Sequence, residues 1–254
     1  MARRRLPLAP TFRPADITGA TMAVVMQALA QRRSVAQAAE IAADAGEWAG
    51  ELSAQVQERI PPASPIACRE GCAFCCHLKV LATGPEVLRL AEHLRASRTA
   101  DELRAIGERV AAADDRTRGM TTDQRVRAQL ACPLLEGGRC GAYEARPIAC
   151  RGANSLDAAA CQRGFENPEE DVSLPIYKPA LQVTEALRNG IAAGVARGGL
   201  DGRALELNSA LRIALQDPEA GKAWARGKPA FAAAVDAEID EAARGARPAG
   251  ATPR

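Results

Sequence analysis

Aromatic side chains are scarce in this 254-residue chain, where Phe, Trp and Tyr together make up only 3% of the residues. Hydrophobic residues nevertheless reach 47%, so Ala and Leu must fill most of the core. An interior rich in these two residues and poor in β-branched ones favours packed helices over sheets. The sequence therefore predicts a mostly α protein with helical flanks around a small loop-rich core and at most a short β-hairpin.

The chain also lacks an excess of charge of either sign and a long apolar run. Its 33 basic and 31 acidic side chains leave a formal net charge of +2, which gives no reason to expect a nucleic-acid or anionic-membrane partner. No run of about eighteen apolar residues exists to cross a bilayer. The basic start at 3–5 is followed by three prolines between Leu6 and Pro14 instead of the apolar segment of a signal peptide. We therefore expect a cytoplasmic protein.

Cysteine is absent outside two short regions, and the first of these ends with one of only two histidines. Because thiols persist as thiolates or metal ligands in a reducing compartment, bunched cysteines point to a metal site. A secreted disulfide protein of this size would instead spread its cysteines to staple distant loops. The two regions contain Cys68, Cys72, Cys75, Cys76 and His77 in the first, and Cys132, Cys140, Cys150 and Cys161 in the second.

The spacing within the first region is typical of metal ligands. Cysteines separated by two or three residues in a turn can aim their sulfurs at one point, as zinc requires with its bonds of about 2.3 Å to sulfur. Two such regions joined by a helical excursion then supply the two halves of a site. We expect all eight cysteines to be ligands, and the metal to be zinc, iron or the iron of an iron–sulfur cluster.

The adjacent pair Cys75-Cys76 restricts how these ligands combine. Neighbouring side chains in extended backbone point to opposite sides, so both rarely bind one ion. Either they serve two separate centres, or one is a ligand and the other lies behind it. His77 would either replace one cysteine as a metal ligand or pack beside the site without binding the metal. A nucleophilic thiol at this pair, with His77 as its base, is a third interpretation that needs geometry beyond the sequence.

Basic residues flank both cysteine regions. Four thiolates around Zn²⁺ leave a net charge of −2, which is costly to bury without N–H donors. Side chains that would offset this charge are Arg69, Lys79, Arg139, Arg146 and Arg151. We expect four residues to surround the ligands without binding the metal themselves, namely His77, Tyr143, Arg146 and Arg151.

The order of these residues resembles the YkgJ-type cysteine-cluster proteins. The matching motifs are Cys68-x3-Cys72-x2-Cys75-Cys76, Cys132-Pro133-x-Leu135 and Cys140-x2-Tyr143-x2-Arg146-Pro147-x2-Cys150-Arg151. The resemblance covers residues 64 to 165 and implies a zinc- or iron-chelating domain, with Cys161 at the place of a further cysteine in small members. One departure is the sequence after Arg151, where members often have an apolar-Pro step and this chain has Gly152-Ala153-Asn154-Ser155.

The resemblance also admits an enzyme, because a larger relative in the same broad group is a flagellin lysine methylase. No Gly-rich loop follows a strand in this chain to bind a nucleotide or a methyl donor. Metal binding that locks a loop-built core is therefore the first hypothesis. The alternative is an iron–sulfur or iron-dependent enzyme with a redox or protein-modifying reaction.

The expected organisation places helices on both sides of the cysteine regions. The predicted segments are a disordered basic tail (1–14), an N-terminal helical segment (15–60), a cysteine-cluster domain (61–165) with a helical insert (84–129), a C-terminal helical segment (166–244) and a disordered tail (245–254). Predicted helices are Ala15–Arg32, Ser34–Arg59, Gly84–Ser97, Thr99–Ala113, Asp123–Gln129, Pro179–Gly198, Arg203–Gln216 and Pro229–Arg244. We also expect a loop at 114–119, a turn at Gly137-Gly138 that joins a hairpin, and a non-helical path from Tyr143 to Cys161.

Overall fold

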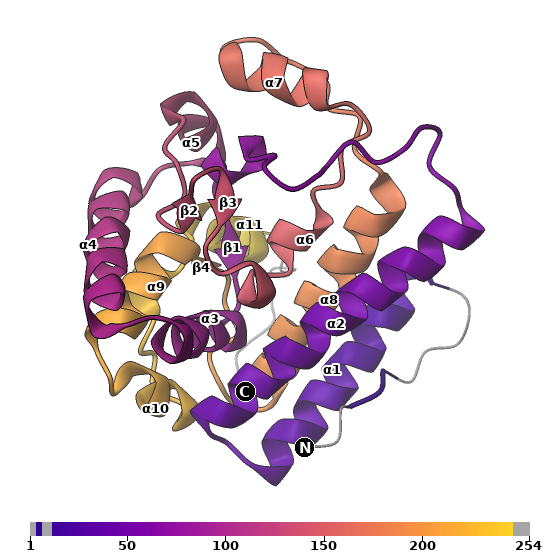
Figure 1. The fold of residues 1–254 in the computed structure, drawn as a ribbon. Coiled ribbons are helices and arrows are strands. Elements are labelled where there is room, and N and C mark those ends of the chain that lie inside the picture. The colour runs from indigo at the N-terminus through magenta and orange to yellow at the C-terminus, as the bar shows by residue number, and fades with distance from the viewer. Residues whose placement is uncertain (1–3, 7–11, 246–254) are drawn as a thin grey trace.

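The computed structural model describes residues 4–6 and 12–245, the last four by their backbone alone. Most of the two predicted tails lies outside these described residues. The described part contains eleven α-helices and two sheets of two short strands each, so the prediction of a mostly α protein is confirmed (Figure 1). Within it, every helix is too short or too polar to cross a lipid bilayer.

Three helices lie side by side and form one layer (Figure 1). They are α1 (Pro14–Gln31), α2 (Val35–Arg59) and α8 (Lys178–Arg197). Ser34 caps α2, because its Oγ accepts the Gln37 N–H at 3.1 Å. The apolar stripe of α2, from Ile41 to Val56, is buried. Ahead of this layer, Arg4 pairs with Asp44 of α2 at 2.8 Å.

A second layer packs against α2 through α3. It is formed by α3 (Gly84–Ser97), α4 (Ala100–Thr117), α9 (Leu207–Gln216) and α10 (Ala220–Ala225). The start of α3 is fixed by Thr83, whose N–H and hydroxyl both donate to Glu86 Oε2 at 2.7 Å. Glu86 Oε1 accepts the Ile148 N–H at 2.7 Å, so this cap also holds the second cysteine region.

Two antiparallel strand pairs connect these layers to the cysteine regions. Strand β1 (Leu81–Ala82) pairs with β4 (Leu205–Glu206), and β2 (Leu135–Glu136) pairs with β3 (Arg139–Cys140). Gly137 and Gly138 join β2 to β3 with φ of 56° and 78°, a left-handed backbone that glycine adopts without a steric cost. The predicted hairpin is confirmed.

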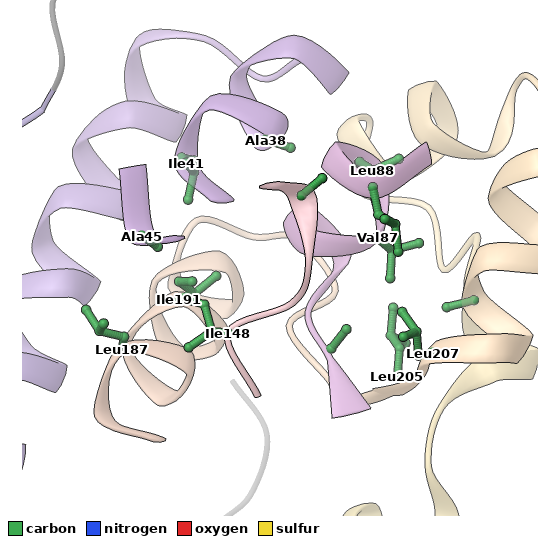
Figure 2. Close-up of a cluster of buried hydrophobic side chains, with 14 of the residues drawn as sticks. Ala38, Ile41, Ala45, Val87, Leu88, Ile148, Leu187, Ile191, Leu205 and Leu207 are labelled. Carbon is green, nitrogen blue, oxygen red and sulfur yellow. The ribbon is translucent and has the colours of Figure 1, made fainter. Parts of the chain in front are cut away.

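The hydrophobic core is continuous from the flanking helices into the cysteine segment (Figure 2). Ile41 of α2, Leu88 of α3, Ile191 of α8 and Leu207 of α9 surround it, and Ile148 lies among them. In the sequence, Ile148 lies between Cys140 and Cys150, and its side chain is only 1% exposed. The cysteine regions are therefore built on the same core as the helical flanks.

Helix α4 is longer than predicted, because it continues through the expected loop to Thr117. The cause is Asp114, which is fully buried and accepts hydrogen bonds from Ser209, Arg118 and Arg212. These partners come from the next turn of α4 and from α9. The contacts hold the last turn of α4 against α9, so the loop prediction is wrong for residues 114–117.

Three other predictions of secondary structure are wrong in part. The path to Cys161 contains α6 (Ala149–Gly152) and α7 (Ala158–Glu166), which Asp157 caps by accepting the Ala159 and Ala160 N–H groups. The helix predicted to begin at Arg203 begins at Leu207, because Leu205 and Glu206 form β4 and pair with β1. The predicted C-terminal helix is divided into η3, a 3₁₀ helix (Ala232–Ala234), and α11 (Ala237–Gly245), with Asp236 between them bound to Lys79 at 2.5 Å. Helix α10 has no predicted counterpart.

Acidification is expected to remove the contribution of Asp114 to stability. Burial raises the pKa of this carboxyl, but the hydrogen bonds from Ser209, Arg212 and Arg118 outweigh it and hold the pKa below its ordinary value. The folded state therefore binds the proton more weakly than the unfolded chain, whose Asp pKa is about 3.9. The stabilisation is fully present above that pH and is lost as pH falls through the folded value.

Urea unfolding between pH 7 and pH 3 measures this effect. Asp114→Asn is expected to lose about 1–2 kcal/mol at pH 7 and to show a shallower loss of stability on acidification. Asp115→Asn is the matched control, because Asp115 is exposed and bound to the same Arg212 at 2.5 Å. Equal acid slopes for both variants and the wild type would contradict the role of Asp114.

Candidate metal centre

The first cysteine region follows a series of tight turns. The Cys72 N–H donates to Arg69 O at 3.0 Å, and Gly71 completes this turn with φ of 83°. The Cys76 N–H donates to Ala73 O at 2.9 Å, as the chain enters the 3₁₀ helix η1 (Phe74–His77). The Cys-x3-Cys and Cys-x2-Cys spacings therefore lie in turns, as metal-ligand spacings usually do.

Hydrogen bonds join the first region to the second at both of its ends. The Cys132 N–H donates to Cys76 O at 2.7 Å. At the other end, Cys68 Sγ accepts the Ser155 N–H and donates to Ala153 O, both at 3.3 Å. The fold thus brings together two segments that the sequence separates by more than fifty residues.

Most of the electrostatic interactions among the eight thiols lie within two sets of four, and Cys75, which also acts on Cys76 and Cys150, connects the two sets. Ionised Cys76 would be repelled by three cysteines of the second region, whereas ionised Cys68 would be repelled by Cys72, Cys75 and Cys161. We call the first group the inner set and the second group the outer set. The inner set is Cys76, Cys132, Cys140 and Cys150, and the outer set is Cys68, Cys72, Cys75 and Cys161.

The inner set is the more enclosed of the two. Cys132 and Cys140 pack against the hydrophobic core, and Cys140 lies on β3 opposite Leu135. Burial raises the pKa of the Cys132 thiol to about 11 and also raises the pKa of Cys150. These thiols therefore stay protonated at neutral pH unless a cation or a hydrogen-bond donor stabilises the thiolate.

The outer set lines a cavity of about 560 Å³. Cys68 and Cys75 are exposed, while Cys161 belongs to α7, which lies apart from the helix layers in Figure 1. Helix α7 contacts η1, where the Phe165 ring lies 4.7 Å from His77 and 5.8 Å from Phe74. The rest of the cavity wall includes apolar side chains and four carboxylates, namely Leu78, Val126, Val172, Leu174, Ile176, Asp123, Glu169, Glu170 and Asp171.

The adjacent pair Cys75-Cys76 links the two sets. The interaction between the two side chains raises the pKa of Cys75 and lowers that of Cys76, so Cys76 is the sulfur of the pair that ionises first. One sulfur of the pair belongs to each set. This is the arrangement expected of a doublet whose members face different groups of thiols.

His77 lies half-buried on the cavity wall. Its Nδ1 is 3.1 Å from Ala73 O. Because a carbonyl oxygen can only accept, Nδ1 carries the proton and Nε2 is the nitrogen with a free lone pair. Metal-binding histidines commonly have this pattern of one nitrogen bonded to a backbone carbonyl. His77 therefore remains both a candidate ligand and a candidate neighbour of the outer set.

Three of the five basic residues that flank the cysteines are engaged elsewhere or exposed. Lys79 is bound to Asp236 and to Glu238, and exposed Arg139 pairs with Glu70 at 3.2 Å. Arg69 is exposed. Lys79 in particular is a poor partner for thiolates, because two carboxylates already neutralise its ammonium group.

The other two, Arg146 and Arg151, lie close to cysteines. Arg146 stacks at 3.9 Å over the ring of Tyr143, which is 59% exposed, and its charge acts on Cys75. Arg151 donates to the backbone oxygens of Glu144 and Arg146, and its guanidinium interacts with Cys150. Tyr143 thus acts on the outer set through Arg146.

The residue missed in the sequence is Arg125, which lies in α5 (Thr122–Ala128) and is only 2% exposed. Its Nε and Nη1 have no hydrogen-bond partner, and its charge interacts with Cys132 and Glu206. A polar helix just before the second cysteine region gives no sign that its arginine is buried. The proximity of Arg125 to Cys132 depends on tertiary packing alone.

The donor chemistry and these arginines fit a negatively charged metal–thiolate group. Four buried side-chain nitrogen or oxygen atoms lack a partner in the described part, and three of them belong to Arg125 and Arg146. A centre with four thiolates would give both arginines the negatively charged partner that they lack. Within the same residues, no three His, Cys, Asp or Glu side chains already lie close enough to hold an ion, so the sulfurs must draw together on binding.

Comparison with known proteins finds a family to which the cysteine segment is similar. Residues 67–170 match the family model CxxCxxCC, described as "Putative zinc- or iron-chelating domain". No curated protein and no solved structure matches the chain. The matched segment contains all eight cysteines and leaves out α1, α2 and the helices from α8 onward. Residues 67–170, which are less than half of the chain, are therefore similar to the CxxCxxCC family.

Proposed function

We propose that this protein chelates zinc or iron in two four-thiolate centres, one formed by the inner set and one by the outer set. The observation that carries the proposal is the position of the Cys75-Cys76 doublet between the sets, with one sulfur in each. The sequence left open whether the doublet serves two centres or holds one thiol in reserve. The division of the eight thiols into two groups of four favours two centres.

Metal binding at the inner set would stabilise the loop-built part of the fold. Its four cysteines stand on η1, on β3, on α6 and just before β2. These are short elements that one ion would cross-link. The binding free energy of a structural metal acts as folding free energy when the ligands are scattered in the unfolded chain. All eight cysteines are free thiols, which suits the reducing cytoplasm that we propose as the compartment.

A second candidate function is an iron–sulfur or iron-dependent enzyme with a redox or protein-modifying reaction. The cavity beside the outer set favours it, because ligand sites are concave, mostly apolar and carry a few polar groups. In this case the inner set would hold the fold, while the outer set would supply redox or Lewis-acid chemistry to a bound substrate. His77 and Arg146 are the side chains placed to orient that substrate.

Elemental analysis and a visible spectrum on anaerobically purified protein test both functions. Two zinc ions per colourless chain would support chelation in two centres, and broad visible absorbance with iron would support the second function. One ion per chain would favour a single centre with reserve thiols. Less than one ion per chain, even after incubation with reductant and metal, would refute metal binding by this chain.

A further inference from the structure

Helix α5 buries its arginine and exposes most of its other side chains. Arg125 is 2% exposed, whereas Val126, the one β-branched apolar residue of this helix, is only half-buried. Thr121 fixes the start of α5 through a capping box with Gln124. The cap fixes where α5 begins, and the helix turns its other polar side chains to solvent, so the Arg125 side chain points to the protein interior. A helix that buries its arginine and leaves its valine half-buried is unfavourable unless another group compensates the buried charge.

The buried guanidinium lacks the partners that usually accompany a buried charge. Its Nε and Nη1 donate to no acceptor. Glu206 is the carboxylate that acts on it most strongly, but Glu206 also accepts the Ser209 N–H at 2.9 Å, at the start of α9. Burial lowers the pKa of Arg125, which is the direction expected for an under-compensated cation. The metal-free protein therefore holds a costly unpaired charge.

Besides Glu206 and the like-charged Arg116, the Cys132 thiol is close enough to act on this cation. The interaction is reciprocal, since each of the two groups lies close enough to act electrostatically on the other. A metal centre with four thiolates and one divalent ion carries a net charge of −2. Such a centre would give Arg125 the negative partner that the metal-free protein does not provide.

Arg146 is the natural comparison, because its Nε also lacks a partner. Its side chain, however, is only half-buried and stacks over an exposed Tyr143 ring. Solvent and the aromatic face therefore reduce its need for a charged partner. Arg125 has neither form of compensation among the contacts described.

We propose that Arg125 is a positioning residue of the inner set, whose guanidinium neutralises the thiolates of Cys132 and its neighbours once they bind metal. The inference rests on the proposed function and extends it by assigning the counter-charge of one centre. The unpaired charge of Arg125 destabilises the metal-free fold, and metal binding at the inner set removes this destabilisation. Arg125 should therefore affect metal affinity and metal-free stability in opposite directions.

Zinc affinity measured against a competing chelator tests this role. The full chain with Cys68→Ser and Cys161→Ser serves as background, because the inner set is then the one complete set of four thiols. In this background Arg125→Met is expected to weaken zinc binding about 10- to 100-fold, as loss of a group that supports metal ligands typically does. Arg125→Lys should recover part of the loss, because it keeps the charge but not the guanidinium geometry. Arg104→Met is the matched control, since Arg104 is exposed on α4 and pairs with the exposed Asp101, so its loss should leave affinity unchanged.

The urea midpoint of the metal-free proteins gives the second readout. Arg125→Met is expected to raise this midpoint, because the variant no longer buries an unpaired cation. Unchanged zinc affinity in Arg125→Met would overturn the inference while leaving the proposed function intact. A lower metal-free midpoint together with no rescue by Lys would also overturn it, since that is the result of a structural role. A background protein that binds no zinc would overturn the proposed function, and the inference with it.

Discussion

Cys140→Ser is expected to remove one of two bound metal ions and to lower the melting temperature by roughly 10 °C. Cys140 belongs to the inner set, pairs through β3 with Leu135 and packs against the core. An ion at this set cross-links the hairpin to η1 and α6. Apparent free energies for structural zinc reach about 10 kcal/mol or more, so losing even a third of that value is a large fraction of the stability of a domain.

Cys161→Ser is the matched variant, because it removes one thiol of the outer set and none of the inner set. Cys161 lies on α7, whose main contact with the rest of the protein is at η1. We expect this variant to lose the other metal ion but to melt within a few degrees of the wild type, since few buried contacts depend on α7. The measurements are elemental analysis and thermal unfolding followed by circular dichroism, with and without a chelator.

The pair of variants decides between two centres and one. If the two centres are separate, each variant retains one ion and the double variant retains none. If either single variant loses all of the metal, the eight cysteines serve one centre and the division into inner and outer sets is wrong. A chelator that leaves the wild-type melting temperature unchanged would show that the ions do not support the fold.

Local signals in the sequence predicted the elements whose ends depend on one or two side chains. Ser34 and Thr83 stand where the structure has helix caps, and Gly137-Gly138 stands where a hairpin needs positive φ. Each of these effects acts over three or four residues, within the range that a sequence pattern covers. Asp157, which precedes three alanines, is a cap of the same kind that marks α7 and that the sequence interpretation missed.

Errors arose where contacts between distant residues decide the structure. The last turn of α4 depends on Asp114 meeting Ser209 and Arg212, and the break before α11 accompanies the pairing of Asp236 with Lys79. Neither of these contacts is indicated by the residues next to it in the sequence. The same holds at the candidate site, where spacing identified the cysteines but did not divide them into sets or reveal Arg125. The expected segment boundaries at 60–61 and 165–166 stay a prediction, although Ile148 shares its core with the flanking helices.

The packing of α8 on α1 provides the second large expected effect. Gly190 and Gly194 of α8 face α1 so closely that a side chain has no room. A Cβ added at Gly190 would lie 2.5 Å from Thr21 Cβ and 2.8 Å from the backbone oxygen of Thr18. The Thr18 hydroxyl also donates to Ala186 O at 3.1 Å across the two helices. The clash involves backbone, so it is relieved by moving one helix and not by turning a side chain.

Gly190→Ala is therefore expected to destabilise the protein by about 3 kcal/mol, the upper end of the usual cost of overpacking a core. Separating the helices would loosen contacts of buried Val25 and Ile191 as well. Chemical unfolding followed by circular dichroism measures the loss. Metal content of the folded fraction should stay at the wild-type value, because residues 67–170 carry all eight cysteines and lie outside this interface.

Gly50→Ala is the control, because Gly50 is exposed on α2 and a Cβ there would meet no atom within 4 Å. Alanine in an exposed helix interior is more favourable than glycine by about 0.5–1 kcal/mol, so this variant should be more stable than the wild type. The same substitution thus has opposite signs at two helical positions. A gain in stability for Gly190→Ala would mean that α1 and α8 pack less closely than the structure indicates. A loss at Gly190 alone would establish that glycine permits the close approach of these helices, on which the layer formed by α1, α2 and α8 depends.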